Sequence, residues 1–398
     1  MTKPRPVWDI TLPAALLLMA PFDILASLAM DIYLPVVPAM PGLLNTTPSV
    51  IQLTLSLYMV MLGAGQVIFG PISDRIGRRP VLLAGAMLFA VASSGAALSS
   101  TATAFIVCRL LQSIGASAAL VATFATVRDV YANRPEGTVI YGLFSGMLAF
   151  VPAIGPVAAA LIAAWFGWRA IFITLGVLAC AAVLNAAFKW RETLRVDQTK
   201  TRPSVLPIFG SPAFWVYTVA FSAAMGSFFV FFSTAPRVLI GQAGYSAFAF
   251  SLAFATVALV MIATTRFAKG FIVRWDIAGC VARGMMLLIA GSALLAVGEV
   301  FGSPSFLSFI LPMWVIAVGI VLTVSVTANG ALAQFDDIAG TAVAFYFCIQ
   351  SLIVSIIGTM AVTMLDGDTA WPVVSYATVM AMLVLVGLRV LRWRKNNG

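Results

Sequence analysis

PFDILASLAMDIYLPVVP, residues 21–38, is an apolar stretch that carries two carboxylates, Asp23 and Asp31. The chain around it has 398 residues, of which 62% are hydrophobic and only 9% are charged. A soluble protein of this length could not cover its surface with so few charges. The sequence therefore predicts an all-α membrane protein that crosses the bilayer many times, because helices satisfy their own backbone groups in lipid.

The two carboxylates are the first candidates for function. A carboxylate at membrane depth is costly, so Asp23, near the middle of its helix, is expected to face an aqueous cavity or a partner. Ser27 and Met30 follow Asp23 at i+4 and i+7 and share its helix face. Asp31 lies nearer the helix end, where a role in ordering the next turn and a role in carrying a proton are equally compatible with the sequence.

A membrane helix needs about 20 mainly apolar residues, and this rule predicts twelve spans. The longest polar interruption, KWRETLRVDQTKTRP at residues 189–203, separates the sixth predicted helix from the seventh. We therefore expect two pseudo-symmetric six-helix halves, 1–188 and 206–398, joined by a cytoplasmic linker, 189–205. The predicted helices are centred near Phe22, Met59, Met87, Ser113, Phe150, Gly176, Ser222, Val257, Leu288, Ile316, Val354 and Val379.

The basic residues indicate the orientation of the chain. Most of the 23 Lys and Arg residues lie at the two termini or in the even-numbered gaps between predicted helices. By the positive-inside rule, both termini are expected in the cytoplasm. The formal net charge of +9 thus reflects topology and does not predict a nucleic-acid-binding surface.

The sequence lacks the residues and motifs that several kinds of chemistry require. Histidine is absent, and the four cysteines are far apart and form no CxxC pair. No metal site, disulfide framework or phosphate-binding GxxxxGK[ST] loop is predicted. We expect no enzyme activity and no cofactor, and any proton that crosses the membrane must use carboxylates.

A short basic turn follows the second predicted helix, GPISDRIGRRPVLL at residues 70–83. Glycines at both of its ends are expected to let two helices approach closely. An acid in this turn can accept hydrogen bonds from basic groups or from a helix N-terminus and so fix one closed arrangement. The residues that we assign to conformational gating here are Gly70, Asp74, Arg75, Gly77, Arg78 and Arg79.

This turn resembles the signature loop between helices two and three of the major facilitator superfamily. Residues 109–115, RLLQSIG, are similar to an RxxQG-type motif on helix four of that family. Residues 31–38 resemble the DxYLPxxP element of its twelve-helix drug:proton antiporters, and residues 146–156 resemble the helix-breaking Gly-Pro motif of the antiporters. The resemblance implies the major facilitator fold, with Gly155 and Pro156 as further gating residues.

Within this branch the chain looks most similar to the exporters of chloramphenicol and florfenicol, the phenicols. Residues 23–41, 123–137 and 228–239 carry this closer likeness. It implies a proton-coupled antiporter of the bacterial inner membrane that works by alternating access, acts as a monomer and confers phenicol resistance.

Arg109 is the basic residue that lies inside a predicted helix. It cannot lose its proton to escape the bilayer, so it must find an anion or water. Helices one and four both line the cavity of the N-terminal half in the fold implied by the resemblance. Asp23 is therefore the expected partner of Arg109, with Asp31 as the alternative, and these three residues are the candidates for proton coupling.

A pocket for an aromatic phenicol would be mostly apolar with few polar groups. Phe228 and Phe232 share a helix face at i, i+4, and Tyr58 offers a ring and a hydroxyl. Such aromatic residues more often fill a core or face lipid. With Gln112 beside Arg109, they complete the expected substrate site around Asp23, Ser27 and Met30.

Three alternatives remain open. The substrate could be another small amphipathic compound. The chain could also be a proton-coupled importer of a sugar or other nutrient, although the Gly-Pro motif of the fifth helix speaks against this. A non-transporting membrane sensor would be expected to carry an added soluble domain, and the sequence predicts none.

Overall fold

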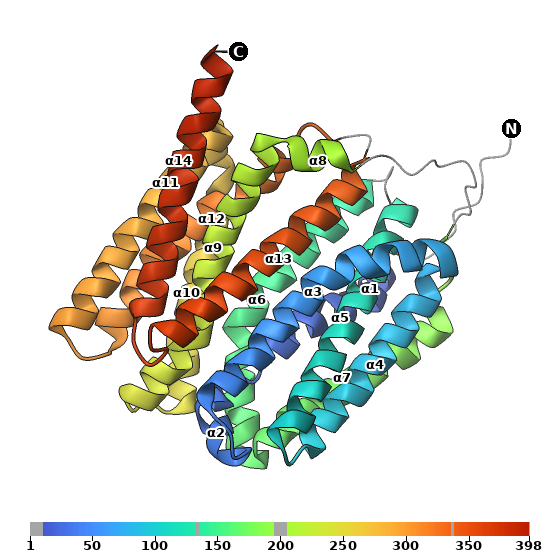
Figure 1. The fold of residues 1–398 in the computed structure, drawn as a ribbon. Helices are drawn as coiled ribbons and strands as arrows, with labels where there is room; N and C mark the ends of the chain where they lie inside the picture. Colours follow the sequence, from blue (N-terminus) through green and yellow to red (C-terminus); the bar gives the residue numbers. More distant parts are fainter. Residues whose placement is uncertain (1–10, 132–134, 195–204, 336–337, 398) are drawn as a thin grey trace, which may run out of the picture. The chain divides into compact units, whose positions relative to one another are not determined.

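The computed structural model describes residues 11–131, 135–194, 205–335 and 338–397. These residues form twelve long helices joined by short turns and short helical segments, and they include no β-strand (Figure 1). The short segments are η1 (Leu34–Ala39), α2 (Met40–Leu43), α8 (Leu206–Gly210), η2 (Arg237–Gln242) and η3 (Phe306–Ile310). The long helices are α1 (Leu12–Asp31), α3 (Pro48–Ile76), α4 (Arg78–Leu98), α5 (Ala102–Tyr131), α6 (Pro135–Phe166), α7 (Trp168–Lys189), α9 (Pro212–Pro236), α10 (Ala247–Thr265), α11 (Ala268–Phe301), α12 (Leu311–Leu332), α13 (Ala339–Met364) and α14 (Trp371–Asn397).

The long helices match the predicted membrane spans. Each of the twelve predicted centres falls within a separate long helix, so the twelve-helix prediction is confirmed. Within the described residues, eleven stretches are long and apolar enough to cross a membrane, and the twelfth helix, α6, contributes the shorter apolar stretch Phe150–Phe166. The chain is a multi-pass membrane protein.

The helices group into two compact units. Unit 1 comprises Met1–Tyr33 and Leu57–Thr201, and unit 2 comprises Leu34–Ser56 and Arg202–Gly398. Residues 34–56, which the sequence analysis assigns to the first half, thus pack with the second. The predicted boundaries 1–188, 189–205 and 206–398 stay a prediction.

Unit 1 is built around a close pair of helices, α4 and α5. α4 also packs against α7, and α1 packs against α5, α6 and α7 (Figure 1). A Cβ atom placed on Gly115 of α5 would lie 2.5 Å from the carbonyl oxygen of Gly85 in α4. Small residues at such a crossing allow two membrane helices to approach backbone to backbone.

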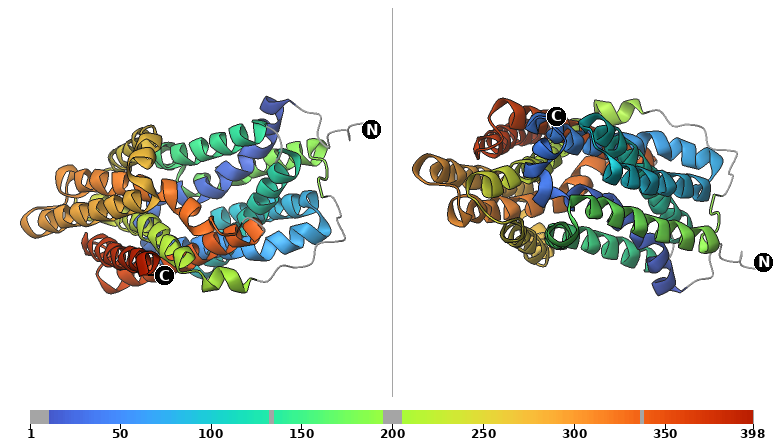
Figure 2. Two further views of the ribbon diagram at one scale, coloured as in Figure 1. Left: turned by 90° about the horizontal axis from the view of Figure 1, so that it is seen from above. Right: turned by 90° about the horizontal axis from the view of Figure 1, so that it is seen from below.

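Unit 2 contains a matching close pair, α11 and α12. A Cβ atom on Gly319 of α12 would lie 2.7 Å from the carbonyl oxygen of Gly284 in α11. The yellow-green α9 runs beside the orange α12 and the red α14, and it also packs against α13 (Figure 2). The Tyr376 hydroxyl of α14 donates to the carbonyl oxygen of Ser222 in α9 at 2.9 Å, which fastens these two helices together.

Candidate functional site

Arg109 of α5 is the centre of the buried polar groups in unit 1. Its side chain is 0% exposed. Its Nη1 donates to the carbonyl oxygen of Ala29 in α1 at 2.8 Å and to Oε1 of Gln112. The guanidinium carbon lies 4.7 Å from the ring centroid of Tyr33 and 4.6 Å from that of Tyr58. The cation is thus held between two aromatic faces and the end of α1.

The end of α1 explains why this position suits a cation. α1 ends at Asp31, so the carbonyl oxygen of Ala29 belongs to the last turn, whose carbonyls lack intrahelical partners. The C-terminal end of a helix also carries partial negative charge. The faces of Tyr33 and Tyr58 add attraction for a cation. Arg109 therefore caps α1.

Gln112 and Tyr58 are fixed by hydrogen bonds of their own. Nε2 of Gln112 donates to Oγ of Ser93 at 2.8 Å, which turns the amide oxygen toward Arg109. The hydroxyl of Tyr58 donates to the carbonyl oxygen of Ala26 at 2.7 Å. Both side chains are 0% exposed, so the surroundings of Arg109 are tightly packed.

The expected pair of Arg109 with Asp23 is not made in this structure. No ion pair within 4.0 Å joins Arg109 to Asp23 or to Asp31 in the part of the chain that the structure describes. Asp23 lies six residues, about 9 Å along an α-helix, before the carbonyl that Arg109 contacts. Asp31 lies two residues after Ala29, on a different side of the helix. Nε and Nη2 of Arg109 have no hydrogen-bond partner among the described residues.

Asp23 is also buried without complete bonding. The residue is 5% exposed, and its Oδ2 has no hydrogen-bond partner within the described chain. The Ser27 hydroxyl donates to the main-chain oxygen of Asp23 at 3.5 Å and not to its carboxylate. Ser27 and Met30 are half-buried on the same helix. A buried carboxylate whose oxygen accepts no hydrogen bond carries a large desolvation cost. A residue that served only to pack the helices would not be expected to carry this cost.

Asp31 lies beside the predicted gating residue Gly155. Asp31 is the last residue of α1 and is 6% exposed. A Cβ atom on Gly155 of α6 would lie 3.1 Å from Cδ1 of Leu28 and 3.7 Å from Cβ of Asp31. Pro156 follows within the same helix. Gly155 therefore lies against the C-terminal end of α1, while α6 continues as a helix through Gly155 and Pro156.

Phe228 and Phe232 belong to unit 2. Their ring centroids lie 6.1 Å and 6.3 Å from that of Phe254 in α10. The face that they share is therefore packed against α10, within an aromatic cluster that also contains Phe231. Phe232 is buried and Phe228 half-buried in this arrangement.

The basic turn between α3 and α4 holds a cluster of charges around Arg78. Nη2 of Arg78 lies 2.6 Å from Oδ1 of Asp74, and its Nε lies 3.0 Å from Oδ2 of Asp129 in α5. Its Nη1 donates to Oγ of Ser73 at 3.0 Å. Arg78 thereby ties the ends of α3, α4 and α5 together, and the gating role of this turn stays a prediction.

Glu192, just after α7, caps the N-terminus of α4. Its carboxylate accepts the backbone N–H groups of Arg78 at 2.9 Å and Arg79 at 3.1 Å. Burial alone would raise the pKa of Glu192, but backbone N–H donors hold this pKa below its ordinary value. These donors are the amides of Leu194, Arg78, Arg79 and Thr193. The sequence analysis missed this residue, although an acid directly after the sixth helix was the available signal.

The glycines of the turn differ in their roles. Gly77 has φ 108°, a conformation that favours glycine, and a Cβ atom there would lie 2.5 Å from Oε2 of Glu192. A Cβ atom on Gly70 would meet nothing within 4 Å. Gly77 is therefore approached closely by the Glu192 side chain rather than by another helix, and Gly70 faces open space. Arg75 is exposed, while Arg79 donates from Nη2 to the carbonyl oxygen of Ala187 at 2.7 Å.

Charges buried inside spanning helices mark substrate or ion pathways in membrane proteins. The fold and the site thus define a polytopic membrane transport protein. A family model described as Major Facilitator Superfamily matches residues 22–359, and the chain belongs to this family. This membership and the names of the relatives indicate a transporter rather than an enzyme.

Relatives and a solved structure narrow the comparison. The chain is 51% identical to a chloramphenicol resistance protein of Pseudomonas aeruginosa over 98% of this chain and 94% of that protein. It is 26% identical to the multidrug resistance protein MdtL of Shewanella sp. (strain ANA-3) over 84% of this chain and 86% of that protein. The crystal structure of a D-xylose-proton symporter shares the fold, with a TM-score of 0.76, 16% identity, and coverage of 93% of this chain and 96% of that one.

Proposed function

We propose that this chain is a proton-coupled antiporter that exports chloramphenicol and florfenicol and so confers phenicol resistance. The observation that carries the proposal is the pair of incompletely bonded charges in unit 1, Asp23 and Arg109. The 51% identity to a protein named for chloramphenicol resistance supports the substrate class. No cofactor is needed, because the proton gradient supplies the energy.

The drug is proposed to bind beside Asp23, on the face that also carries Ser27 and Met30. Phenicols are neutral and bear hydroxyl and amide groups, which can donate to the unpartnered oxygen of Asp23 and accept from the free N–H groups of Arg109. Protonation of Asp23 from the outer side, directly or by way of Asp31, then neutralises this acceptor and releases the drug. The two units rock around this site in alternating access, as major facilitator transporters do.

The proton gradient is sufficient for this exchange. One proton that enters for each neutral drug that leaves moves one charge, which is worth about 2.3 kcal/mol per 100 mV of membrane potential. Each pH unit across the membrane adds about 1.4 kcal/mol. A drug gradient of tenfold costs about 1.4 kcal/mol, so either component alone supports export.

The placement of the protein completes the proposal. The distribution of Lys and Arg supports cytoplasmic positions for both termini, and the bacterial relatives support placement in an inner membrane. The partners are the drug, protons and lipid, with no nucleic acid, and a monomer suffices because both units come from one chain.

The proposed coupling is tested first by Asp23→Asn, with Asp366→Asn as the matched control. Asp366 lies in the turn between α13 and α14, where its Oδ1 accepts the backbone N–H of Asp368, and an Asn oxygen can do the same. We expect Asp23→Asn to abolish export while the protein still reaches the membrane, and Asp366→Asn to export normally. Full export by Asp23→Asn would remove Asp23 from the mechanism.

The substrate is tested by accumulation of labelled chloramphenicol and florfenicol in cells that express the chain, with and without a protonophore. We expect low accumulation that rises when the proton gradient collapses. Accumulation equal to that of empty cells would overturn the phenicol assignment and turn the search to other small amphipathic compounds. Energised uptake of a sugar by vesicles would instead favour the importer.

A further inference from the structure

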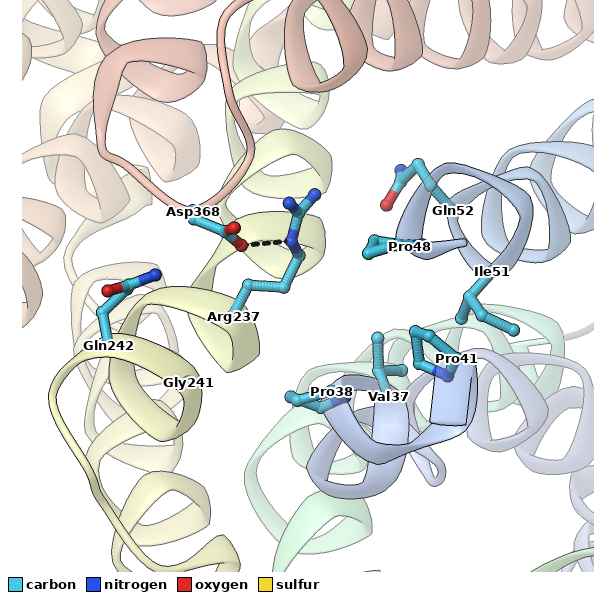
Figure 3. A pocket seen from close by; sticks show the side chains of 10 residues that line it. All are labelled: Val37, Pro38, Pro41, Pro48, Ile51, Gln52, Arg237, Gly241, Gln242 and Asp368. Carbon is cyan, nitrogen blue, oxygen red and sulfur yellow. Dashed lines mark hydrogen bonds and ion pairs between the residues drawn. The ribbon is translucent and has the colours of Figure 1, made fainter. Parts of the chain in front are cut away.

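Unit 2 contains a cavity of about 220 Å³ that the proposed mechanism does not use. Residues of the 34–56 segment form one wall, and the junction of α9 with η2 and the turn between α13 and α14 form the other (Figure 3). Its lining includes none of the residues assigned above to proton coupling or substrate binding. The cavity is therefore a separate candidate site.

A π-helical turn shapes the cavity. After Pro236 the chain continues as η2, in which the N–H of Ala243 donates to the carbonyl oxygen of Val238, five residues earlier, at 3.0 Å. This wider turn places Arg237, Gly241 and Gln242 on the cavity. Turns of this kind are rare and occur frequently at functional sites.

The polar wall has no net charge but retains free hydrogen-bonding groups. Nε of Arg237 donates to Oδ1 of Asp368 at 2.6 Å, and the guanidinium lies against Gly367, where a Cβ atom would collide with it. Nη1 and Nη2 of Arg237 make no hydrogen bond to any described residue, and in Figure 3 they point away from Asp368. The side chains of Arg237 and Asp368 are 17% and 40% exposed, so a molecule in the cavity can reach both.

The facing wall is apolar with one amide. Gln52 donates from Nε2 to Oγ of Ser233 at 3.0 Å, which fixes the amide at the edge of the cavity. Figure 3 shows the other side chains of this wall clustered on η1, α2 and the start of α3. They are Val37, Pro38, Pro41, Pro48 and Ile51.

We infer that this cavity is a second drug-binding site, which takes a neutral aromatic compound with hydroxyl and amide groups. An anion would be repelled by Asp368 and a cation by Arg237, whereas a neutral molecule can bond to both without breaking their pair. The proline-rich wall suits an aromatic ring. The volume is below the roughly 300–1,000 Å³ of sites for whole drugs, so it holds the ring and one polar arm. The inference rests on the proposed function for its choice of ligand.

The site can be filled without disturbing the fold. A Cβ atom on Gly241 would meet nothing within 4 Å and Gly241 lines the cavity, so Gly241→Leu adds a side chain at the cavity wall without a collision. Gly42 is the matched control, because a Cβ atom there also meets nothing within 4 Å and Gly42 does not line the cavity. Gly42→Leu therefore adds the same side chain to a nearby exposed position.

The readout is equilibrium binding of labelled chloramphenicol to the purified full chain. We expect two molecules per wild-type chain, two for Gly42→Leu and one for Gly241→Leu. Asp23→Asn should keep the molecule that Gly241→Leu loses. The anionic succinate ester of chloramphenicol should fail to displace that molecule, and Arg237→Gln should weaken its binding about tenfold.

The outcomes separate this inference from the proposed function. If export is intact and Gly241→Leu binds as many molecules as wild type, the second site is excluded and the exporter stands. If cells export no phenicol and the purified chain binds none, both fail. Should Gly241→Leu not accumulate in membranes, Gln242→Cys alkylated with N-ethylmaleimide fills the same cavity in folded protein, with the identically treated parent chain as its control. Undiminished binding after that alkylation would overturn the inference.

Discussion

The two units share a scaffold and differ in their buried charge. In each, one pair of helices crosses at a pair of glycines, Gly85 with Gly115 in unit 1 and Gly284 with Gly319 in unit 2. Among the described residues, the buried charged side chains all lie in unit 1, and unit 2 buries hydroxyl and amide groups instead. The four buried charged residues are Asp23, Asp31, Arg78 and Arg109. The difference teaches that glycine crossings provide the common frame, while the buried charges of the described residues are concentrated in one unit.

The largest expected effect comes from removing the buried cation. We expect Arg109→Gln to abolish export, because the neutral side chain no longer holds the end of α1 or offers charged donors to the drug. In unit 2, Thr327→Val removes the acceptor of the Tyr346 hydroxyl, a hydrogen bond of 3.1 Å, and the longer hydrogen bond of 3.4 Å that the Thr327 hydroxyl donates to the carbonyl oxygen of Val324. It should cost about 1 kcal/mol of stability and leave export intact. Both variants are checked by measuring drug accumulation in cells and the amount of protein in the membrane. If Arg109→Gln and Thr327→Val lost export equally, the proposed difference between unit 1 and unit 2 would be contradicted.

The next effect tests the shared scaffold. Gly115→Ala and Gly319→Ala should each lower the free energy of unfolding by about 1–3 kcal/mol, because a methyl group is forced against the backbone of the facing helix. Gly70→Ala is the control, since its Cβ atom has open space. Thermal melting of the purified variants checks this. A loss in only one unit would show that the two crossings are not equivalent.

The smallest effect concerns the cap on α4. Glu192→Gln should cost about 1 kcal/mol of stability, reduced by solvent screening because Glu192 is exposed. Since the folded pKa of Glu192 is lowered, its contribution is fully present above the unfolded value of about 4.3 and is lost as pH falls through the folded pKa.

Melting curves over this acidic range should therefore bring wild type and Glu192→Gln together. In unit 2, the kink inside α11 is held by Asp276, whose Oδ1 accepts the N–H of Gly279 three residues later. Asp276→Asn keeps an acceptor oxygen and should change the stability less than Glu192→Gln does. A gap between wild type and Glu192→Gln that persists at low pH would exclude the carboxylate cap.

The helices could be predicted from the sequence because the bilayer demands long apolar segments with internally bonded backbones. The identity of Asp23 and Arg109 as unusual buried charges followed from the same rule. The partner of Arg109 could not be predicted, because it depends on how α5 is placed along α1, which apolar periodicity does not specify. The contact of Glu192 with α4 joins segments more than a hundred residues apart and was missed for the same reason.

The position of Arg109 between Tyr33 and Tyr58 has a consequence for energy transduction. The contacts that the permanent charge does make are with two rings, a helix end and an amide, and none of these groups gains or loses a proton at physiological pH. If Asp23 and Asp31 carry the proton as proposed, a change in their protonation would neither make nor break an ion pair with Arg109. The guanidinium would then act as a constant background potential, and the carboxylates would respond to the drug and to the two aqueous compartments rather than to the movement of a counter-ion.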